Sequence, residues 1–211
     1  MCEVLVGGSS GKMALKTFTR AYEQIIKGVD NTLSRISHNQ VEVMINMMLW
    51  ARFRRILVIG VGRSGLIGRA FAMRLMHLDF DVYVMGETIT PAIGKGDLIV
   101  AISGSGTTKL AVTAAAIGKE VGAKIIAITS HPNSDLGKIA DHVVQIRGRT
   151  KIAKERDYFL RQLTGVHEPL APLGTIFELS TMVFFDSLIA ELIQRLGKSE
   201  GELRRKHATI E

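Results

Sequence analysis

The sequence predicts an α/β protein: a doubly wound sheet of five parallel strands in the order 2-1-3-4-5, with helices on both faces. Short, continuously apolar runs of strand length alternate with helical stretches, a pattern typical of a parallel sheet whose strands are buried on both faces. Two of these runs, residues 55–60 and 98–102, lead directly into loops of glycine and hydroxyl residues. In this strand order the first and third strands are neighbours, so both loops are expected to line one crevice.

Length and composition fit one folded unit. The 211 residues, 46% of them hydrophobic, are enough to bury a large core. The single cysteine, Cys2, excludes an internal disulfide, so we expect a fold held by packing in a reducing cytoplasm. The first eleven residues lack the pattern of an export signal, and no apolar run reaches the length of a membrane span. We therefore expect a cytoplasmic protein with no membrane partner.

The charge balance favours an anionic partner. The chain has 27 basic and 20 acidic residues, a formal net charge of +7. The basic residues are scattered over residues 52–55, 147–156 and 204–206, with few aromatic residues between them to stack on bases. This distribution favours a small anionic substrate over nucleic acid.

Residues 13–52 are predicted to be a helical extension at the start of a single domain. Apolar residues recur at helical spacing over residues 13–29, and a second helix is expected to begin near Asn31. Its apolar residues, from Val41 to Trp50, cover more than one side, which predicts burial against another subunit in a homo-oligomer. A helix-turn-helix DNA reader is the alternative, but the region has no glycine-bearing turn between two short helices.

The first strand runs into a glycine loop with the pattern G-x-G-x-x-G at residues 60–65. This pattern is also the dinucleotide fingerprint, and Glu87, just after a second strand at residues 82–85, stands where a ribose-binding acid is expected. An NAD enzyme is therefore a serious alternative. Against it, Arg63 and Ser64 supply a cation and a hydroxyl where the dinucleotide motif needs only backbone.

The second loop, residues 103–108, has the composition of a phosphate cradle. Its glycines permit close approach to the backbone, its serines and threonines supply hydroxyls, and the helix start that follows adds amide donors with partial positive charge. An ordinary turn with Ser or Thr as the helix N-cap is the alternative. Because two such loops are predicted at one crevice, the sequence favours the phosphate interpretation.

The remaining elements follow at the spacing that this fold requires. They are helices at residues 64–78, 108–121 and 134–140 and strands at 124–129 and 142–146. The basic residues 147–170 form either a lid or a solvated connection. A long apolar helix then runs to about Leu196, and Thr175 and Glu178 at its start have the spacing of a capping box, so Glu178 could simply cap its own helix. A charged tail covers residues 199–211.

Four stretches together resemble the sugar isomerase (SIS) domain, and more closely its 6-phospho-3-hexuloisomerase family. They are residues 60–65 (GVGRSG) with 71–78 (FAMRLMHL), 84–91 (VMGETITP), 102–108 (ISGSGTT) and 172–178 (PLGTIFE). The resemblance covers nearly the whole chain after the first helix. It implies the reversible conversion of D-arabino-3-hexulose 6-phosphate, a phosphorylated ketohexose, to fructose 6-phosphate, without a metal or nucleotide cofactor. It also implies a tetramer that serves formaldehyde fixation through the ribulose monophosphate pathway, or pentose supply in reverse.

The resemblance also assigns roles to residues. Glu178 is implied as the proton-transfer base, and the phosphate is implied to be held by Ser64, Ser103, Ser105 and Thr108. The substrate-binding loops as a whole add Gly62, Gly104, Gly106 and Thr107. Thr107 departs from the family, many members of which have a charged residue there. The tail also departs from it, because His207 matches while its neighbours are altered.

The chemistry requires one base and one donor. Moving a carbonyl from carbon three to carbon two means removing a carbon-bound proton and returning it one carbon away through an enediolate, and one carboxylate can do both. His77 and His207 are candidate donors to the enediolate oxygens, and an ordered water is another. His77, on an otherwise apolar helix face, could equally be a packing residue.

Other classes of site are less well supported. Four other histidines show no metal-ligand spacing, so no metal site is predicted; they are His38, His131, His142 and His167. No serine lies in a hydrolase elbow. A sugar-phosphate sensor with no catalytic base remains a second hypothesis, and Glu178 distinguishes it from an enzyme, because a sensor needs no carboxylate facing its ligand.

Overall fold

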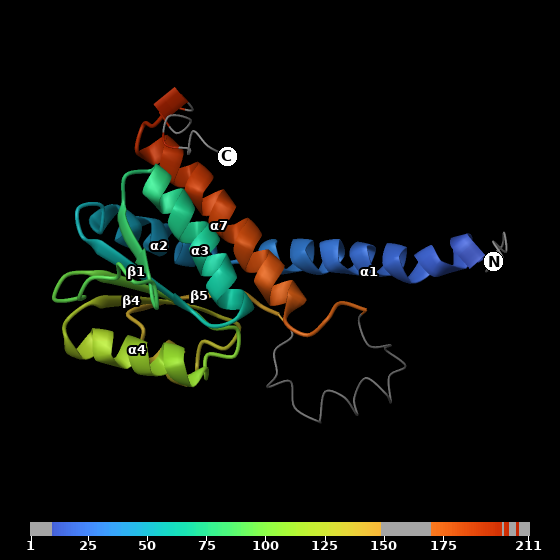
Figure 1. The fold of residues 1–211 in the computed structure, drawn as a ribbon, viewed down its shortest axis with the longest axis horizontal. Coiled ribbons are helices and arrows are strands. Elements are labelled where there is room, and N and C mark those ends of the chain that lie inside the picture. The colour runs from blue at the N-terminus through green and yellow to red at the C-terminus, as the bar shows by residue number, and fades with distance from the viewer. Residues whose placement is uncertain (1–9, 149–169, 200, 203–205, 207–211) are drawn as a thin grey trace, which may run out of the picture.

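The computed structural model describes residues 10–148, 170–199, 201, 202 and 206. Its five strands form one parallel sheet in the order β2-β1-β3-β4-β5, which confirms the predicted topology (Figure 1). The strands are β1 (Arg55–Gly60), β2 (Asp81–Val84), β3 (Leu98–Ile102), β4 (Lys124–Thr129) and β5 (His142–Gln145). The apolar runs therefore located the strands correctly.

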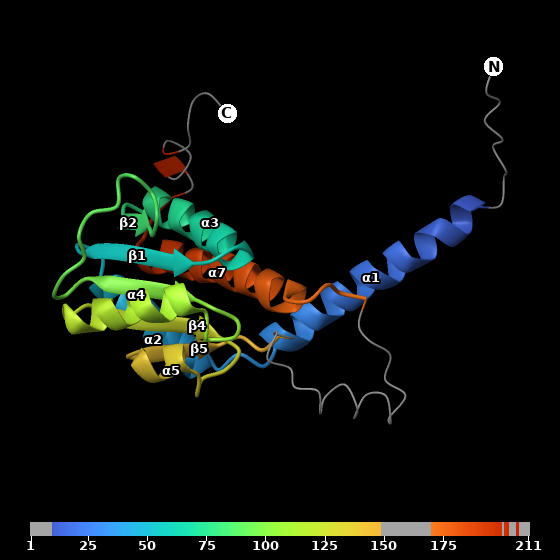
Figure 2. The same ribbon diagram turned by 60° about the horizontal axis from the view of Figure 1, so that its bottom comes forward.

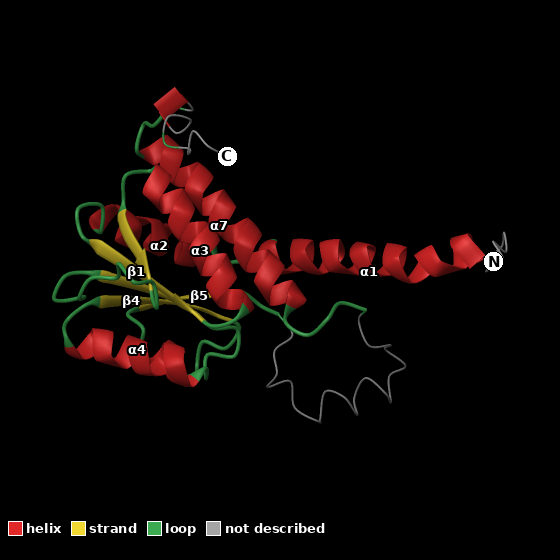
Figure 3. Ribbon diagram, viewed as in Figure 1, coloured by secondary structure: helices red, strands yellow, loops and turns green. Residues whose placement is uncertain are grey.

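Helices cover both faces of this sheet, as Figures 2 and 3 show. One face carries α2, α3 and α7, and the other carries α4 and α5. The bounds are α1 (Ser10–Leu33), α2 (His38–Trp50), α3 (Arg63–His77), α4 (Lys109–Glu120), α5 (Asp135–Ile139) and α7 (Thr175–Arg195). The predicted three-layer α/β architecture is confirmed.

Alternate residues of each strand enter two separate cores. In β3, Leu98, Val100 and Ile102 pack with α2, α3 and α7, whereas Ile99 and Ala101 pack with α4. All five side chains are at most 1% exposed. Because successive side chains of a strand point to opposite faces, a strand covered on both faces must be apolar throughout. This explains the continuous apolar runs in the sequence.

Much of the broad apolar surface of α2 is buried within the chain, and its packing against another subunit stays a prediction. Met44, Ile45 and Met48 are 0 to 2% exposed in the core shared with α7 and the sheet. Trp50 is 44% exposed, and the guanidinium of Arg54 lies 4.4 Å from its ring centroid. The sequence pattern gave the width of the apolar surface but not the identity of the element that covers it.

The first helix is longer than predicted. The expected helix start near Asn31 is wrong, because α1 continues to Leu33 and α2 begins only at His38. The side chain of Ser37 caps α2 by accepting a hydrogen bond from the backbone N–H of Gln40, at 3.4 Å. Figures 1 and 2 both show the N-terminal half of α1 projecting away from the sheet and its covering helices.

Some sequence predictions fall on residues 149–169 and 203–211, most of which lie outside the described part of the chain. They include the basic segment after β5 and His207. Within the described residues, every helix is too short or too polar to cross a lipid bilayer.

Candidate functional site

A pocket of about 460 Å³ lies where β1 and β3 end. Both glycine loops border it, as the strand order predicted, and the start of α7 closes it from a third side. Its lining residues are Val61, Gly62, Arg63, Ser64, Gly104, Ser105, Thr108, Leu173, Gly174, Phe177 and Glu178. We call this the site pocket. It lies at the carboxyl ends of two neighbouring strands, the usual place for a ligand in an open α/β sheet.

Three helices begin at the site pocket. Gly62 precedes α3, Thr108 precedes α4 and Gly174 precedes α7, and all three line the pocket. None of these three N-cap residues uses a side chain to bond the first-turn amides. At the start of α7 the N–H of Thr175 donates to the carbonyl of Pro172 at 3.1 Å. The other first-turn N–H groups and the positive ends of the helix dipoles favour an anion, most of all a phosphate group. The backbone of the three helix starts therefore makes the pocket suitable for an anion.

Two glycines are required by close packing at these loops. A Cβ on Gly60 would lie 2.7 Å from the backbone carbonyl of Ser64, so only glycine lets β1 pass this close to α3. Gly106 has a φ of 67°, and a Cβ there would collide with Ser134. Packing of the strand against its helix thus accounts for the first glycine of the G-x-G-x-x-G pattern.

The hydroxyl loop is held by its own hydrogen bonds. The Oγ of Ser103, which is 2% exposed, lies 2.9 Å from Oγ1 of Thr108 and accepts from the backbone N–H of Gly106 at 3.1 Å. The Oγ of Ser105 accepts from both the backbone N–H and the hydroxyl of Thr107, each at 3.2 Å. These bonds fix Ser105 and Thr108 in place before a ligand arrives.

Glu178 faces the same pocket and forms an ion pair with Arg63. Nε of Arg63 lies 2.6 Å from Oε2 of Glu178, and the two side chains are 56% and 14% exposed. Within the described chain, this oxygen has no hydrogen bond of ordinary geometry. The contact is therefore one of charge with charge, and the carboxylate keeps lone pairs for a ligand.

The packing of α3 against α7 determines this pairing. The rings of Phe71 and Phe185 are stacked, with centroids 3.9 Å apart and an interplanar angle of 9°. Both helices run away from the site pocket, and each ring lies about two turns beyond Arg63 or Glu178 in its own helix. The stack thus fixes the alignment of α3 along α7 that brings the guanidinium of Arg63 to the carboxylate of Glu178.

The capping-box role expected for Glu178 is wrong. The N-cap of α7 is Gly174, with φ 91°, so Thr175 is the first residue inside the helix and not its cap. A capping box needs the acid three residues after the cap, and Glu178 is four residues after it. The carboxylate is therefore not used to cap α7, although the helix dipole still favours a negative charge there.

The structure brings together most of the predicted site residues. Six line the pocket: Gly62, Ser64, Gly104, Ser105, Thr108 and Glu178. Three belong to the hydroxyl loop without lining the pocket: Ser103, Gly106 and Thr107. Their roles in binding and catalysis remain predictions.

His77 is not brought to this pocket. It is the last residue of α3, fourteen residues after Arg63, so about 21 Å of helix separates it from the pocket of its own chain. Its side chain is 8% exposed. His77 therefore does not contact a ligand in the pocket of its own chain.

Sequence reasoning missed two features of the pocket. Arg63 was noted only as an argument against NAD, although a cation between two glycines of a helix-start loop is itself a signal of an anion site. Phe177 and Leu173, which form the apolar wall, carried no sequence signal. Glu87, the expected ribose-binding acid of the NAD alternative, is paired with Arg69 at 2.9 Å.

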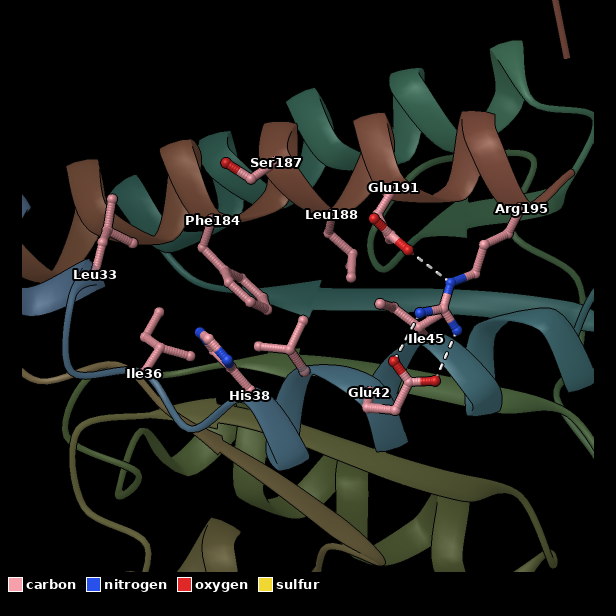
Figure 4. A pocket seen from close by; sticks show the side chains of 11 residues that line it. Leu33, Ile36, His38, Glu42, Ile45, Phe184, Ser187, Leu188, Glu191 and Arg195 are labelled. Atoms are coloured by element: carbon pink, nitrogen blue, oxygen red, sulfur yellow. Dashed lines mark hydrogen bonds and ion pairs between the residues drawn. The ribbon is translucent and has the colours of Figure 1, made fainter. Parts of the chain in front are cut away.

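Among the described residues, no three His, Cys, Asp or Glu side chains gather closely enough to hold a metal ion. A second cavity, of about 480 Å³, lies between α2 and α7 beside the end of α1 (Figure 4). Its mainly apolar walls share no residue with the site pocket. We call it the α2–α7 groove.

Comparison with known proteins identifies the family. Residues 49–164, more than half of the chain, match the model of the SIS domain. The chain belongs to the SIS domain family. This SIS protein is 32% identical over 193 residues to the 3-hexulose-6-phosphate isomerase of Bacillus subtilis, covering 92% of this chain and 98% of the relative. It is 37% identical over 172 residues to the protein of that name from Methanocaldococcus jannaschii, covering 82% and 84%.

A solved structure supports the same assignment. The crystal structure of a Methanococcus jannaschii protein, for which a molecular function of 3-hexulose-6-phosphate isomerase was inferred, has a TM-score of 0.71 and 32% sequence identity. The alignment covers 93% of this SIS chain and 100% of that chain.

Proposed function

We propose that this SIS protein is a phosphosugar isomerase that interconverts D-arabino-3-hexulose 6-phosphate and fructose 6-phosphate. The observation that carries the proposal is a carboxylate, Glu178, in a pocket that three helix N-termini and two hydroxyl loops make suitable for phosphate. The named relatives in B. subtilis and M. jannaschii support the choice of substrate.

The loops are proposed to bind the phosphate. Ser64, Ser105 and Thr108 would donate hydroxyl hydrogen bonds, and the free amides at the starts of α3 and α4 would add backbone donors. Phosphate binding would anchor the sugar so that its reacting carbons lie near Glu178.

Glu178 is proposed to be the base. In the direction from fructose 6-phosphate, its carboxylate takes the proton from carbon three, and the electron pair of that bond forms the carbon–carbon double bond of an enediolate across carbons two and three. The carboxylic acid then returns the proton to carbon two, which leaves the carbonyl at carbon three. One further proton moves between the two oxygens, so the substrate is isomerised with no net gain or loss of atoms.

Arg63 is proposed to serve both steps. Its guanidinium orients the carboxylate of Glu178, and its remaining N–H groups would stabilise the negative enediolate oxygen. This assignment gives the enediolate a donor within the site pocket, where His77 does not lie.

Deuterium exchange tests the proposal directly. In heavy water, the enzyme should remove the signal of the hydrogen on carbon three of fructose 6-phosphate in proton NMR, as 3-hexulose 6-phosphate forms. Exchange at carbon one instead would indicate an aldose–ketose isomerase of the same family. Binding of fructose 6-phosphate without any exchange would indicate a sugar-phosphate sensor and would overturn the proposed reaction.

A further inference from the structure

The end of β4 contributes a buried hydroxyl that supports the hydroxyl loop, residues 103–108, from outside the site pocket. Thr129, the last residue of β4, is 0% exposed. Its Oγ1 donates a hydrogen bond to the backbone carbonyl of Gly104 at 3.3 Å and accepts one from the backbone N–H of His131 at 3.2 Å. A Cβ on Gly106 would lie 3.0 Å from the same oxygen. Thr129 therefore lies against both glycines of the loop without lining the pocket.

Packing alone does not explain a threonine at this position. The four preceding residues of β4 are apolar and buried, as a strand covered on both faces requires. A buried hydroxyl costs free energy unless it is hydrogen-bonded, and valine would have nearly the same shape without that cost. Among the described residues, the hydroxyl of Thr129 bonds only to the hydroxyl loop and to its own turn. Its presence is therefore tied to the loop.

The carbonyl of Gly104 is held from β4 by two donors. The backbone N–H of Ser130 also donates to it, at 3.1 Å, which continues the parallel pairing of β3 with β4 beyond the ends of both strands. Ser130 is itself fixed, because its Oγ donates to the carbonyl of Ile146 at 2.7 Å and its carbonyl accepts from the side chain of Gln145 at 3.1 Å. The support for the loop thus extends to the end of β5.

The direction of this carbonyl determines where the next backbone N–H points. A peptide unit is planar and trans, so its C=O and N–H point in opposite directions. In the sheet, β3 lies between β4 and β1, and the carbonyl of Gly104 points toward β4. The N–H of Ser105 is therefore directed toward the β1 side, where the site pocket lies between the two loops. Within the described part of the chain, no hydrogen bond uses this N–H.

We propose that Thr129 is a positioning residue for phosphate binding. By holding the carbonyl of Gly104, it keeps the N–H of Ser105 facing the pocket, where this N–H donates a charge-assisted hydrogen bond to a phosphate oxygen. Glycine leaves the backbone before this peptide free to turn, so without the Thr129 bond the peptide tilts and the N–H loses its aim. The inference rests on the phosphate binding of the proposed function, and it adds a residue outside the pocket to that site.

The first test is binding, measured by titration calorimetry with inorganic phosphate and with fructose 6-phosphate. Thr129→Val removes the hydroxyl and nearly keeps the shape, so both dissociation constants should rise by about 2- to 10-fold, the factor for one ordinary hydrogen bond. In steady-state kinetics, KM should rise by a similar factor while kcat changes little, because the phosphate takes no part in the proton transfer. Thr129→Ser keeps the hydroxyl and should restore most of the affinity.

Ser130→Ala is the matched control. It also removes a buried hydroxyl that donates to a backbone carbonyl, but that carbonyl belongs to Ile146, outside the hydroxyl loop. Urea unfolding should show a loss of stability in both variants, whereas only Thr129→Val should bind phosphate more weakly. Unchanged affinity in Thr129→Val, or an equal loss in both variants, would overturn the inference while the proposed function stands. A wild type that binds neither compound would overturn the proposed function as well.

The second test observes the N–H itself in the wild-type chain. In a nitrogen–proton correlation NMR spectrum of protein labelled with ¹⁵N at serine only, the signal of Ser105 is the one that Ser105→Ala removes. Saturation with inorganic phosphate should move this signal downfield, because the N–H enters a charge-assisted hydrogen bond. The signal of Ser187, exposed on α7, should stay in place. A Ser105 signal that does not move would show that its N–H makes no contact with the phosphate and would overturn the inference.

Discussion

The guanidinium of Arg63 and the carboxylate of Glu178 meet at 2.6 Å, although α3 and α7 are separated in the sequence by four strands of the sheet. The residues stand at the starts of these two helices, beside the loops that suit a phosphate. Since Glu178 is 14% exposed, the pair is shielded from water on the side of the carboxylate. Substituting Arg63 therefore tests the role of Glu178 while Glu178 itself stays unchanged.

Replacing Arg63 by Gln should lower kcat by about 10- to 150-fold with little change in KM. A hydrogen bond or ion contact between charged groups is worth roughly 1.5–3 kcal/mol, which is that factor in rate if it acts in the transition state. Arg63→Lys should recover part of the loss, because it keeps the charge but not the planar geometry. Steady-state kinetics of the two variants with fructose 6-phosphate measure both effects. If KM rises while kcat is unchanged, Arg63 binds the phosphate and does not serve Glu178.

Replacing Glu178 by Gln should abolish most turnover while leaving the fold intact. The change removes the proton acceptor but keeps size and polarity, so kcat should fall by roughly 10²–10⁴-fold. The melting temperature should change little, because Glu178 does not cap α7. Asp186→Asn, an acid on the exposed part of the same helix with a longer 3.6 Å contact to Arg74, is the matched control and should retain activity. A Glu178→Gln enzyme that keeps most of its activity would exclude this residue as the base.

Replacing Ser105 by Ala should weaken substrate binding. The hydroxyl of Ser105 lines the pocket and also receives two hydrogen bonds from Thr107, so its loss removes a phosphate donor and loosens the loop. One hydroxyl bond to a charged group contributes roughly 1.5–3 kcal/mol, which corresponds to an increase in KM of about 10- to 150-fold. Ser187→Ala, which removes an exposed hydroxyl on α7, serves as the control. Equal KM values for Ser105→Ala and the wild type would remove Ser105 from the site.

Replacing Asp79 by Asn should destabilise the protein only above acidic pH. Hydrogen bonds from Lys198 and then Lys206 lower the pKa of Asp79 from 3.8 to about 2. Because the folded-state pKa is the lower one, the stabilisation is complete above pH 4 and is lost as the pH falls toward 2. Because the Asp79 carboxylate is largely in water, this stabilisation should be below about 1 kcal/mol. Asn also tolerates the φ of 65° at this position.

The check is urea unfolding of the wild type and Asp79→Asn at pH 7 and at pH 2. The difference in free energy of unfolding should be present at pH 7 and mostly lost at pH 2. A difference that is the same at both values would show that the carboxylate charge does not contribute.

The architecture could be read from the sequence because it depends on local patterns. A strand buried on both faces has to be apolar at nearly every position, so β1, β3 and β4 are recognisable in the sequence as continuous apolar runs. The loops after β1 and β3 are equally visible in the sequence through their glycines. A Cβ at Gly60 would meet the backbone of Ser64, and a Cβ at Gly106, where φ is 67°, would meet the side chain of Ser134. Strand order then predicted that both loops share one pocket.

Contacts between distant segments could not be read in this way. An apolar helix surface predicts burial but does not identify the covering element. Met44, Ile45 and Met48 of α2 are covered by their own chain, whereas Phe18 and Ile26 of α1 are 66 and 65% exposed. The sequence by itself therefore determined the sheet, its order and the two hydroxyl loops, whose requirements are local. Only the tertiary structure decided that α7 begins at the same pocket, that Arg63 meets Glu178 and that His77 lies a helix length away. Those positions depend on how packed helices are aligned along one another, as the stacked rings of Phe71 and Phe185 align α3 and α7. Side-chain packing between segments more than a hundred residues apart leaves no periodic pattern in the sequence.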